Sequence, residues 1–526
     1  MGIYLNCGNI SFQQILNGIY VDKTGLIDFI NSTIDTTDKL TSFSRPRRFG
    51  KSYAAKMLNA YYDRSCDSRK LFDGLEISKS NSYGQYRNCF DVIYLDITRF
   101  ISLAKDINHI LSDIQVSVVR ELREAFPGCI RENEDILPDA LVNITQKTGH
   151  RFFIIIDEWD ALFREAKNDE NLQKAYIQFL RGLFKSGPST DIAIAGAYMT
   201  GILPIKKYGT ESALTDFREY TMTEPDILAE YVGFTEQEVK TLCNVYDVDF
   251  SEMKRWYDGY LLSGCQSVYS PNSVMSAIKR KRFRTYWTNT ETYESLKNYI
   301  SMNLDGLKDA VIAMLGGEKI RINTGRFKND MSTFKSKDDV LTLLVHLGYL
   351  AYDEQRAEVS IPNQEIADEF KNAVEGEDWH EIEEALTDSE ALLNATIQGN
   401  AAAVAEALSR IHSSHYSILS YNDENFLSCA ITIAYFTAQK DYTIIRELPT
   451  GKGFADLAFI PAGNTDKPAM IVELKYDKSA DTAVRQIKEN RYDGALRKYK
   501  KDLLLVGINY DKATKKHECM IERFKD

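Results

Sequence analysis

Three short runs of apolar, β-branched residues in the first 220 positions constrain the fold most strongly. They are DVIYLDIT at 91–98, RFFIIID at 151–157 and DIAIAGAYMTG at 191–201, and stretches with helical periodicity separate them. Strands without a polar face are typical of a parallel sheet that crossover helices cover on both sides. The pattern therefore predicts an α/β fold with a buried parallel sheet in the first part of the chain.

A phosphate-binding loop is predicted where KLTSFSRPRRFGKS joins one strand to a helix. In such P-loops, backbone N–H groups hold phosphate oxygens, a Lys neutralises the β- and γ-phosphates, and a Ser hydroxyl ligates Mg²⁺. The match is partial, because Arg45 stands where the motif GxxxxGK[ST] has its first glycine. The candidate nucleotide-binding residues in this loop are Arg48, Phe49, Gly50, Lys51 and Ser52.

An apolar strand that ends in two acids, FFIIIDE at 152–158, supports the same site. Asp157 is placed to hold Mg²⁺ through water, and Glu158 to polarise the attacking water. A buried strand with a solvated acidic end would look alike, but both motifs in the correct order favour a nucleotide site. Thr200 follows the next apolar strand and is a candidate γ-phosphate sensor, with a simple turn threonine as the alternative.

The segments RPRRFGKS, IIIDEWDAL, MTGILPI, WYDGY and YWTNT resemble the AAA-ATPase-like family of bacterial and archaeal proteins. That family often carries Arg-Pro-Arg-Arg before Phe-Gly-Lys-Ser, so the resemblance implies that Arg45 is compatible with ATP binding. The segment YVDKT at 20–24 also fits the family's N-terminal pattern. The resemblance extends to about residue 300 and implies a P-loop NTPase sheet with a helical extension that binds and hydrolyses ATP.

A second phosphate chemistry is predicted in the tail, where the strand AMIVELKY contains Glu473 and Lys475. Residues two apart on a strand point to one face, about 7 Å apart. Asp456 lies on the preceding strand, so Asp456 and Glu473 could share one divalent cation. Glu424 and Glu447 are candidates for a further ligand. Such carboxylates hold Mg²⁺, or Mn²⁺, against a phosphate, while Lys475 stabilises the developing charge.

This arrangement resembles the PD-(D/E)XK nuclease superfamily over about residues 415–512, with Asp456 and Glu473-x-Lys475 in the signature positions. The resemblance implies a C-terminal restriction-endonuclease-like α/β domain with nuclease activity. It also implies that Gln486, on the helix after the signature, supports the site or contacts DNA.

Phe454 departs from this pattern, because the family often has an arginine at that position. The leading expectation is an ATP-controlled nuclease that acts on nucleic acid, with DNA ahead of RNA. The alternative is an ATPase switch whose catalytically inactive tail binds nucleic acid or protein, and Phe454 favours it. If these residues have no catalytic role, the alternative is a structural salt bridge between Glu473 and Lys475 on an edge strand.

The uneven distribution of charge bears on the nucleic-acid expectation, because the net charge of the chain is -12. Residues 351–393 carry 14 acidic and two basic side chains. Their balance of -12 equals the net charge of the whole chain. Residues 41–90 carry a balance of +6 and residues 475–526 a balance of +5. Both proposed phosphate sites therefore lie in basic regions, and the net charge does not exclude a nucleic-acid enzyme.

The eight cysteines form no CxxC pair, which favours reduced thiols, no zinc site and a cytoplasmic location. No signal peptide or apolar stretch of membrane-spanning length is evident, and a homo-oligomer is left open. We expect four domains: a P-loop AAA-ATPase-like domain at 1–220, a helical extension at 221–300, a winged-helix-like and acidic helical linker at 301–395, and a nuclease-like domain at 396–526.

Overall fold

The protein is described by a computed structural model and forms two compact units. Unit 1 comprises Met1–Trp287 and Arg321–Glu365, and unit 2 comprises Thr288–Ile320 and Ile366–Asp526. The four domains expected from the sequence are a finer division than these two units, and their boundaries stay predictions. The structure describes residues 2–526 except 186, 188, 209–210, 263–264, 288–291, 303, 329–330, 332, 375–379, 415–430, 432–433, 436, 439–440, 451–452, 462–466, 490–495, 497–501 and 525–526.

The centre of unit 1 is a five-stranded sheet in the order β2-β3-β4-β1-β7, in which every neighbouring pair is parallel. All residues of β1, β3 and β4 are buried, as expected for strands covered on both faces. The predicted parallel α/β sheet is confirmed. The strands are β1 (Leu40–Ser44), β2 (Asp91–Asp96), β3 (Phe152–Asp157), β4 (Ile194–Gly201) and β7 (Arg218–Tyr220).

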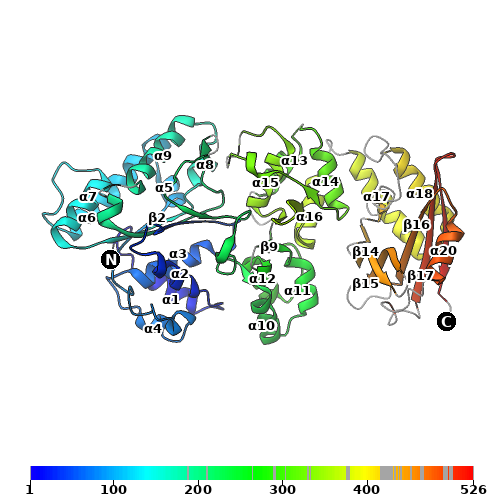
Figure 1. The fold of residues 1–526 in the computed structure, drawn as a ribbon, viewed down its shortest axis with the longest axis horizontal. Helices are drawn as coiled ribbons and strands as arrows, with labels where there is room; N and C mark the ends of the chain where they lie inside the picture. The colour runs from blue at the N-terminus through cyan, green and yellow to red at the C-terminus, as the bar shows by residue number, and fades with distance from the viewer. Residues whose placement is uncertain are drawn as a thin grey trace. The chain divides into compact units, whose positions relative to one another are not determined.

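Helices cover both faces of this sheet (Figure 1). On one side lie α1 (Ile10–Leu16), α2 (Gly25–Thr33), α3 (Lys51–Tyr62) and α4 (Arg69–Phe72). On the other side lie α5 (Ile97–Leu103), α6 (Ile110–Ala125), α7 (Leu137–Thr148), α8 (Ala161–Glu165) and α9 (Glu170–Phe184).

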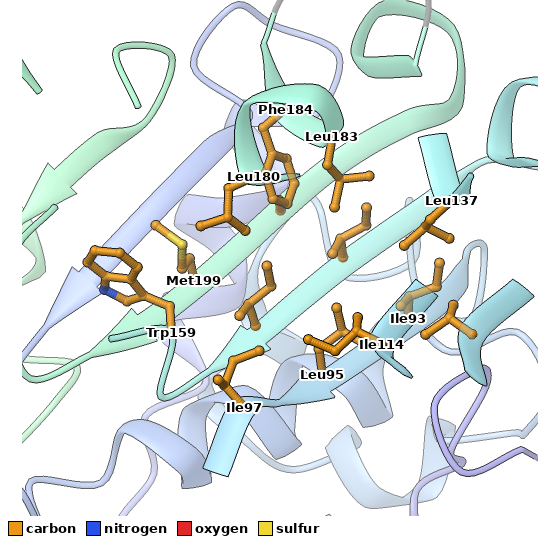
Figure 2. Close-up of a cluster of buried hydrophobic side chains, with 14 of the residues drawn as sticks. Ile93, Leu95, Ile97, Ile114, Leu137, Trp159, Leu180, Leu183, Phe184 and Met199 are labelled. Carbon is orange, nitrogen blue, oxygen red and sulfur yellow. The ribbon is translucent and has the colours of Figure 1, made fainter. Parts of the chain in front are cut away.

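Apolar side chains from the second group of helices pack on the sheet and form a large core (Figure 2). Helix α6 contributes Ile114 and helix α9 contributes Leu180, and both meet strand residues such as Leu95 and Met199. Burying one side chain of this size contributes about 1.5–3 kcal/mol. The core therefore holds rigid the strand ends that carry the candidate nucleotide site.

The remainder of unit 1 contains a small antiparallel sheet in the order β8-β10-β9 and the helices around it. The segment Arg321–Glu365 returns to this region, where the Tyr260 hydroxyl donates to the Gly348 carbonyl at 2.7 Å. A Cβ on Gly259 would lie 2.0 Å from the Pro362 carbonyl oxygen, so the glycine of WYDGY permits a close backbone approach. The elements are β8 (Phe234–Thr235), α10 (Glu236–Tyr246), α11 (Phe250–Tyr257), β9 (Tyr260–Leu262), β10 (Cys265–Tyr269), α12 (Pro271–Arg280), α15 (Lys337–Leu347), β12 (Ala351–Asp353) and β13 (Glu358–Ser360).

Unit 2 is built on a mixed sheet in the order β14-β15-β16-β17-β18, in which only β16 and β17 are parallel. Helix α20 (Ala480–Glu489) connects these two strands and covers one face, with Val484 and Ile487 against Ile471 of β16. Side chains from α17 (His380–Ile397) and α18 (Ala401–Ser414) cover the other face. The strands are β14 (Tyr442–Thr450), β15 (Gly453–Pro461), β16 (Ala469–Tyr476), β17 (Leu503–Asp511) and β18 (Lys516–Arg523).

The other helices of the chain include α13, α14 and α16, and none of the helices within the described ranges is long and apolar enough to span a bilayer. The remaining elements are η1 (Glu76–Lys79), η2 (Ile107–His109), η3 (Ser189–Ala193), β5 (Lys207–Tyr208), β6 (Glu211–Ser212), η4 (Asp226–Leu228), α13 (Thr292–Ile300), α14 (Leu307–Leu315), β11 (Ile320–Arg321), η5 (Thr324–Arg326) and α16 (Gln364–Val374).

Candidate functional sites

The phosphate-binding loop joins β1 to α3, and Gly50 forms the cap that precedes the helix. Gly50 has a φ of +100°, a conformation that favours glycine. The first N–H groups of a helix have no partner inside the helix, so the start of α3 can bind a phosphate. The Lys51 side chain is buried, and its Nζ donates to the Pro46 carbonyl at 3.0 Å. The backbone geometry is that of an anion site with a lysine at its edge.

Asp157 and Thr200 lie at the adjacent ends of β3 and β4, and both side chains are buried. Burial raises the pKa of Asp157, and the Ser52 hydroxyl counteracts part of the rise. The Tyr94 hydroxyl donates to Asp157 Oδ2 at 3.0 Å. Within the described part of the chain, Asp157 Oδ1 and Thr200 Oγ1 have no hydrogen-bond partner. Buried polar atoms rarely stay unsatisfied, so these atoms suit a ligand such as a hydrated Mg²⁺ with a phosphate.

Glu158 directly follows β3 and is held between two cations. Its Oε2 accepts from Arg164 Nη2 at 2.5 Å, and its Oε1 lies 3.6 Å from Lys51 Nζ. Burial raises the pKa of Glu158, but the charges of Lys51 and Arg164 outweigh it and leave the pKa below its ordinary value. The carboxylate is therefore ionised and able to accept a proton, although its pair with Arg164 restrains it.

Arg45, the departure from the P-loop motif, is wholly buried. Its Nη1 donates to the Ser44 and Thr221 carbonyls at 2.9 and 2.8 Å, and its guanidinium carbon lies 4.6 Å from the centre of the Phe43 ring. Burial lowers the pKa of Arg45. These contacts make Arg45 a structural support of β1 and explain why the loop tolerates an arginine at this position.

Replacing Arg45 with methionine should therefore lower the melting temperature but leave ATP affinity within about threefold of the wild type. Replacing Arg48 with alanine should weaken ATP binding about tenfold or more, because Arg48 lines the cavity beside Lys51 and carries a positive charge. Titration with a fluorescent ATP analogue measures both variants. Equal losses of affinity would give Arg45 a direct role in binding.

A cavity of about 440 Å³ opens at the phosphate-binding loop. Part of its lining is polar and includes Arg48, Gly50, Lys51, Ser52 and Glu158. Another part of the lining is largely apolar and comes from three distant parts of unit 1. Its walls include Ile19, Tyr20, Val21, Tyr231, Phe234 and Met275. Phe49 also lines the cavity. Its ring packs edge-on against the Tyr260 ring, with 5.2 Å between the ring centres. The lining therefore combines groups that can bind an anion with side chains that can contact an apolar group.

The YVDKT segment, to which the sequence assigned no role, forms part of this wall. Asp22 accepts from the Thr24 and Glu76 N–H groups at 2.9 and 2.7 Å and so holds the segment in place. Lys23 Nζ contacts both Glu238 carboxylate oxygens at 2.7 and 2.6 Å. The placement of this wall depends in part on the contact of Lys23 with Glu238, 215 positions along the chain, which no local pattern reveals.

Asp160, two residues after Glu158, is a buried anchor rather than a ligand. Its carboxylate oxygens accept from the Ile202 and Leu203 N–H groups at 3.1 and 3.0 Å, and one lies 3.3 Å from Arg164 Nε. These bonds connect the segment after β4 to the segment after β3. The IIIDEWDAL and MTGILPI motifs are thus one structural unit that positions Glu158 and Thr200.

Replacing Asp160 with alanine is expected to destabilise unit 1 by about 3–5 kcal/mol, because two buried N–H groups lose their acceptor and the buried Arg164 loses one of the two carboxylates with which it pairs. Asp135 provides a matched control: its carboxylate pairs with Arg123 at the surface at 3.4 Å, and its loss should cost about 0–1 kcal/mol. Urea unfolding monitored in both variants tests the difference. Similar midpoints would mean that Asp160 contributes little.

The tail residues gather at the end of β16 on the face that α20 covers. Glu473 and Lys475 are both buried, and Lys475 Nζ donates to Glu473 Oε1 at 2.9 Å. The Gln486 side-chain amide on α20 donates to the same oxygen. Asp456 Oδ2 accepts from the Leu474 N–H at 2.7 Å, which fixes the aspartate beside the strand. The structure thus brings together Asp456, Glu473, Lys475 and Gln486, whose roles stay predictions.

Electrostatics at this cluster match a site for a cation. Burial and the neighbouring Asp456 charge raise the pKa of Glu473, and Lys475 counteracts part of the rise. Two carboxylates this close repel each other, and a divalent cation would relieve the repulsion. No group of three or more metal-ligating side chains occurs in the described ranges. Glu424 lies outside the described residues, as do the side chains of Glu447 and Phe454.

The two parts of the chain that contain the candidate sites each match a known protein family. Residues 7–210 match a family described as "Predicted AAA-ATPase", and residues 422–519 match the PD-(D/E)XK nuclease superfamily. A protein of Azotobacter chroococcum mcd 1, described as an uncharacterized protein in the vnfD 5' region, is 23% identical over 295 residues. The alignment covers 55% of this chain and 54% of that protein, so the chain spans about half the length of this relative.

Two solved structures share a broad likeness with this chain. One is the Walker-type ATPase PABY2304 of Pyrococcus abyssi. The alignment covers 66% of this chain and 94% of that protein, with 13% identity and a TM-score of 0.33. The other is the Aeropyrum pernix ORC2 protein in its ADPNP–ADP complexes. The alignment covers 68% of this chain and 96% of that protein, with 12% identity and a TM-score of 0.31. Over these two ranges, and not through the two solved structures, the chain is similar to the predicted AAA-ATPase family and, toward its C-terminus, to the PD-(D/E)XK nuclease superfamily.

Proposed function

We propose that this protein is a cytoplasmic ATPase with a Mg²⁺-dependent nuclease domain that cleaves DNA under the control of ATP. The observation that carries the proposal is the cluster on β16, where Lys475 and Gln486 both donate to Glu473 while Asp456 lies beside it. A salt bridge at an exposed strand edge would not bury both of its charged groups. Glu473 and Lys475 are 1% and 5% exposed.

In the ATPase unit, the cavity at the phosphate-binding loop would receive the nucleotide. Its polar lining suits the phosphates, and its apolar lining suits the adenine ring. Lys51 would neutralise charge on the β- and γ-phosphates, and Thr200 would donate to the γ-phosphate. Glu158 would accept a proton from the attacking water once Arg164 or Lys51 no longer restrains it. Ser52 and Asp157 are the residues that would hold the Mg²⁺ of the nucleotide.

In the nuclease unit, Asp456 and Glu473 would hold a divalent cation, with Glu424 as the expected third carboxylate. When bound, Mg²⁺ lowers the pKa of a ligated water and stabilises charge on the scissile phosphate. Lys475 would orient the attacking water and offset the charge that develops on the phosphate. Gln486 would keep the Glu473 carboxylate in the required orientation.

Control by ATP is supported by contacts of Arg48 in the phosphate-binding loop. Arg48 Nη1 donates to the Tyr286 carbonyl at 2.9 Å, and the Tyr286 N–H donates to Glu365 at 2.6 Å. Tyr286 and Glu365 each lie at a position where the chain passes from unit 1 to unit 2. A nucleotide that draws Arg48 toward its phosphates would change this set of bonds, which is a two-state mechanism for control.

The direct test is a cleavage assay with the full chain on single- and double-stranded DNA and RNA. Each substrate is incubated with Mg²⁺ or Mn²⁺, with and without ATP. We expect DNA cleavage that requires a divalent cation and changes in rate with ATP. Binding without cut products under every condition would favour the alternative, an ATPase switch with an inactive tail.

A further inference from the structure

A cluster of positive charge lies at the end of α12. Of its members, Lys279 also lines the nucleotide cavity, while the others are not among the residues that line it. We call it the basic segment, residues 279–284, with the sequence KRKRFR. No aspartate or glutamate occurs between residues 259 and 290, although the chain as a whole has a net charge of -12. The five cations are exposed: Lys279, Arg280, Lys281, Arg282 and Arg284.

Acidic side chains do not compensate these charges. Across the described residues, no ion pair joins any of the five to an aspartate or glutamate, whereas Lys254 and Arg255 nearby are paired with Glu236 and Glu252. Two of the five lie in the last turn of α12, where cations stabilise a helix dipole by about 0.3–1 kcal/mol. Lys281 contacts the Tyr246 and Asp247 carbonyls. Arg282 and Arg284 lie beyond the end of α12, so the helix dipole does not account for their positive charges.

The buried Tyr286 holds the basic segment in a defined conformation. Its hydroxyl donates to the Arg282 carbonyl at 2.8 Å. The guanidinium carbons of Arg280 and Arg284 lie 5.6 and 5.2 Å from the centre of its ring, within cation–π range. Two exposed guanidinium groups are thus gathered over one aromatic ring. Side chains that are already ordered lose less entropy when they bind a ligand.

The same tyrosine connects the basic segment to the nucleotide site. Its carbonyl accepts from Arg48, as described above, and Lys279 at the start of the segment lines the nucleotide cavity. A ligand that moves the segment would therefore act on the phosphate-binding loop through Tyr286. Arginines placed close together in this way match the repeated phosphates of a nucleic-acid backbone.

We propose that the basic segment contacts the sugar–phosphate backbone of DNA and that this contact changes the rate of ATP hydrolysis. The choice of DNA rests on the proposed function, in which DNA is the substrate. A membrane surface does not fit, because the apolar side chains of α12, including Val274 and Ile278, are buried in the protein core and leave no apolar face to insert.

The test replaces Arg280, Arg282 and Arg284 together with glutamine and measures binding of a fluorescent DNA duplex by anisotropy. EDTA is present so that no cleavage can occur. We expect affinity to fall at least about tenfold, and the slope of log K against log salt to fall by about 2 to 3 for three lost phosphate contacts. The corresponding triple lysine variant keeps the charges and should bind within about threefold of the wild type.

The matched control replaces three exposed cations of the same unit, Lys105, Arg120 and Lys167, with glutamine. It should leave both affinity and salt slope unchanged. Without DNA, the triple Gln variant at the basic segment should hydrolyse ATP at the wild-type rate, and the effect of added DNA on that rate should disappear. An unchanged DNA affinity and salt slope would overturn the proposal, as would equal losses in the control.

The result is independent of whether the tail cleaves DNA. Loss of binding in the triple Gln variant, together with no cleavage by the wild type, would support the surface and reject the nuclease proposal. Cleavage by the wild type together with normal binding by the variant would do the reverse. Tighter binding of anionic phospholipid vesicles than of DNA would also reject the basic segment as a DNA surface.

Discussion

Alanine in place of Lys475 is expected to slow single-turnover DNA cleavage by at least about a thousandfold while basal ATP hydrolysis continues at the wild-type rate. The substitution removes the buried ammonium group that lies 2.9 Å from Glu473 Oε1. Without it, the developing charge on the phosphate loses its cation, and burial raises the pKa of Glu473 with less opposition. Quantified gel cleavage with excess enzyme measures the rate of the chemical step.

Lys478→Ala is the matched control for this experiment. Lys478 lies three positions further along the chain, is exposed, and its backbone N–H donates to Asn509 at 3.0 Å. The control should cleave DNA at the wild-type rate. If Lys475→Ala also retained cleavage within about threefold of the wild type, the assignment of the tail site would be wrong.

Alanine in place of Lys51 is expected to reduce ATP turnover by at least about a hundredfold, because a buried cation at the phosphate site is lost. Lys51 is 3% exposed and lies 3.6 Å from the Glu158 carboxylate, so the substitution removes a positive charge from the protein interior beside Glu158. ATP affinity should fall as well. Glu158→Gln should behave differently and lose turnover while it keeps ATP binding, since the amide cannot accept the proton.

Lys56→Ala, on the same helix and five positions further on, is the control for Lys51→Ala and should keep normal turnover. Phosphate release and titration with an ATP analogue separate turnover from binding in all three variants. Normal turnover in Lys51→Ala would contradict the nucleotide site. Loss of binding in Glu158→Gln would mean that Glu158 holds the site together rather than acting on water.

Features that depend on a few neighbouring residues were predictable from the sequence. The apolar runs around Ile155 and Ala197 predicted buried parallel strands, because a strand with no polar face must be covered on both sides. Alternation along β16 predicted that Glu473 and Lys475 share a face. Gln486 was reached by resemblance, and the structure shows why it belongs there: α20 packs back over that face.

Features that depend on distant contacts were not predictable. The apolar lining of the cavity at the phosphate-binding loop combines Tyr20, Tyr231 and Met275, which only the folded chain brings together. The support that Arg45 gives β1 depends on the Thr221 carbonyl, 176 positions away. The return of Arg321–Glu365 to unit 1 depends on contacts such as that of Gly259 with Pro362. Periodicity and motif spacing describe local order and contain no information about these pairs.

The central claim, that one chain couples an ATPase to a nuclease, is tested most directly by one measurement. Cleavage of a fluorescent DNA duplex in Mg²⁺ is followed with and without ATP for the wild type, Lys51→Ala and Lys475→Ala. We expect that ATP changes the wild-type rate, that Lys51→Ala cleaves at a rate insensitive to ATP, and that Lys475→Ala does not cleave. Wild-type cleavage at the same rate with and without ATP would contradict the coupling.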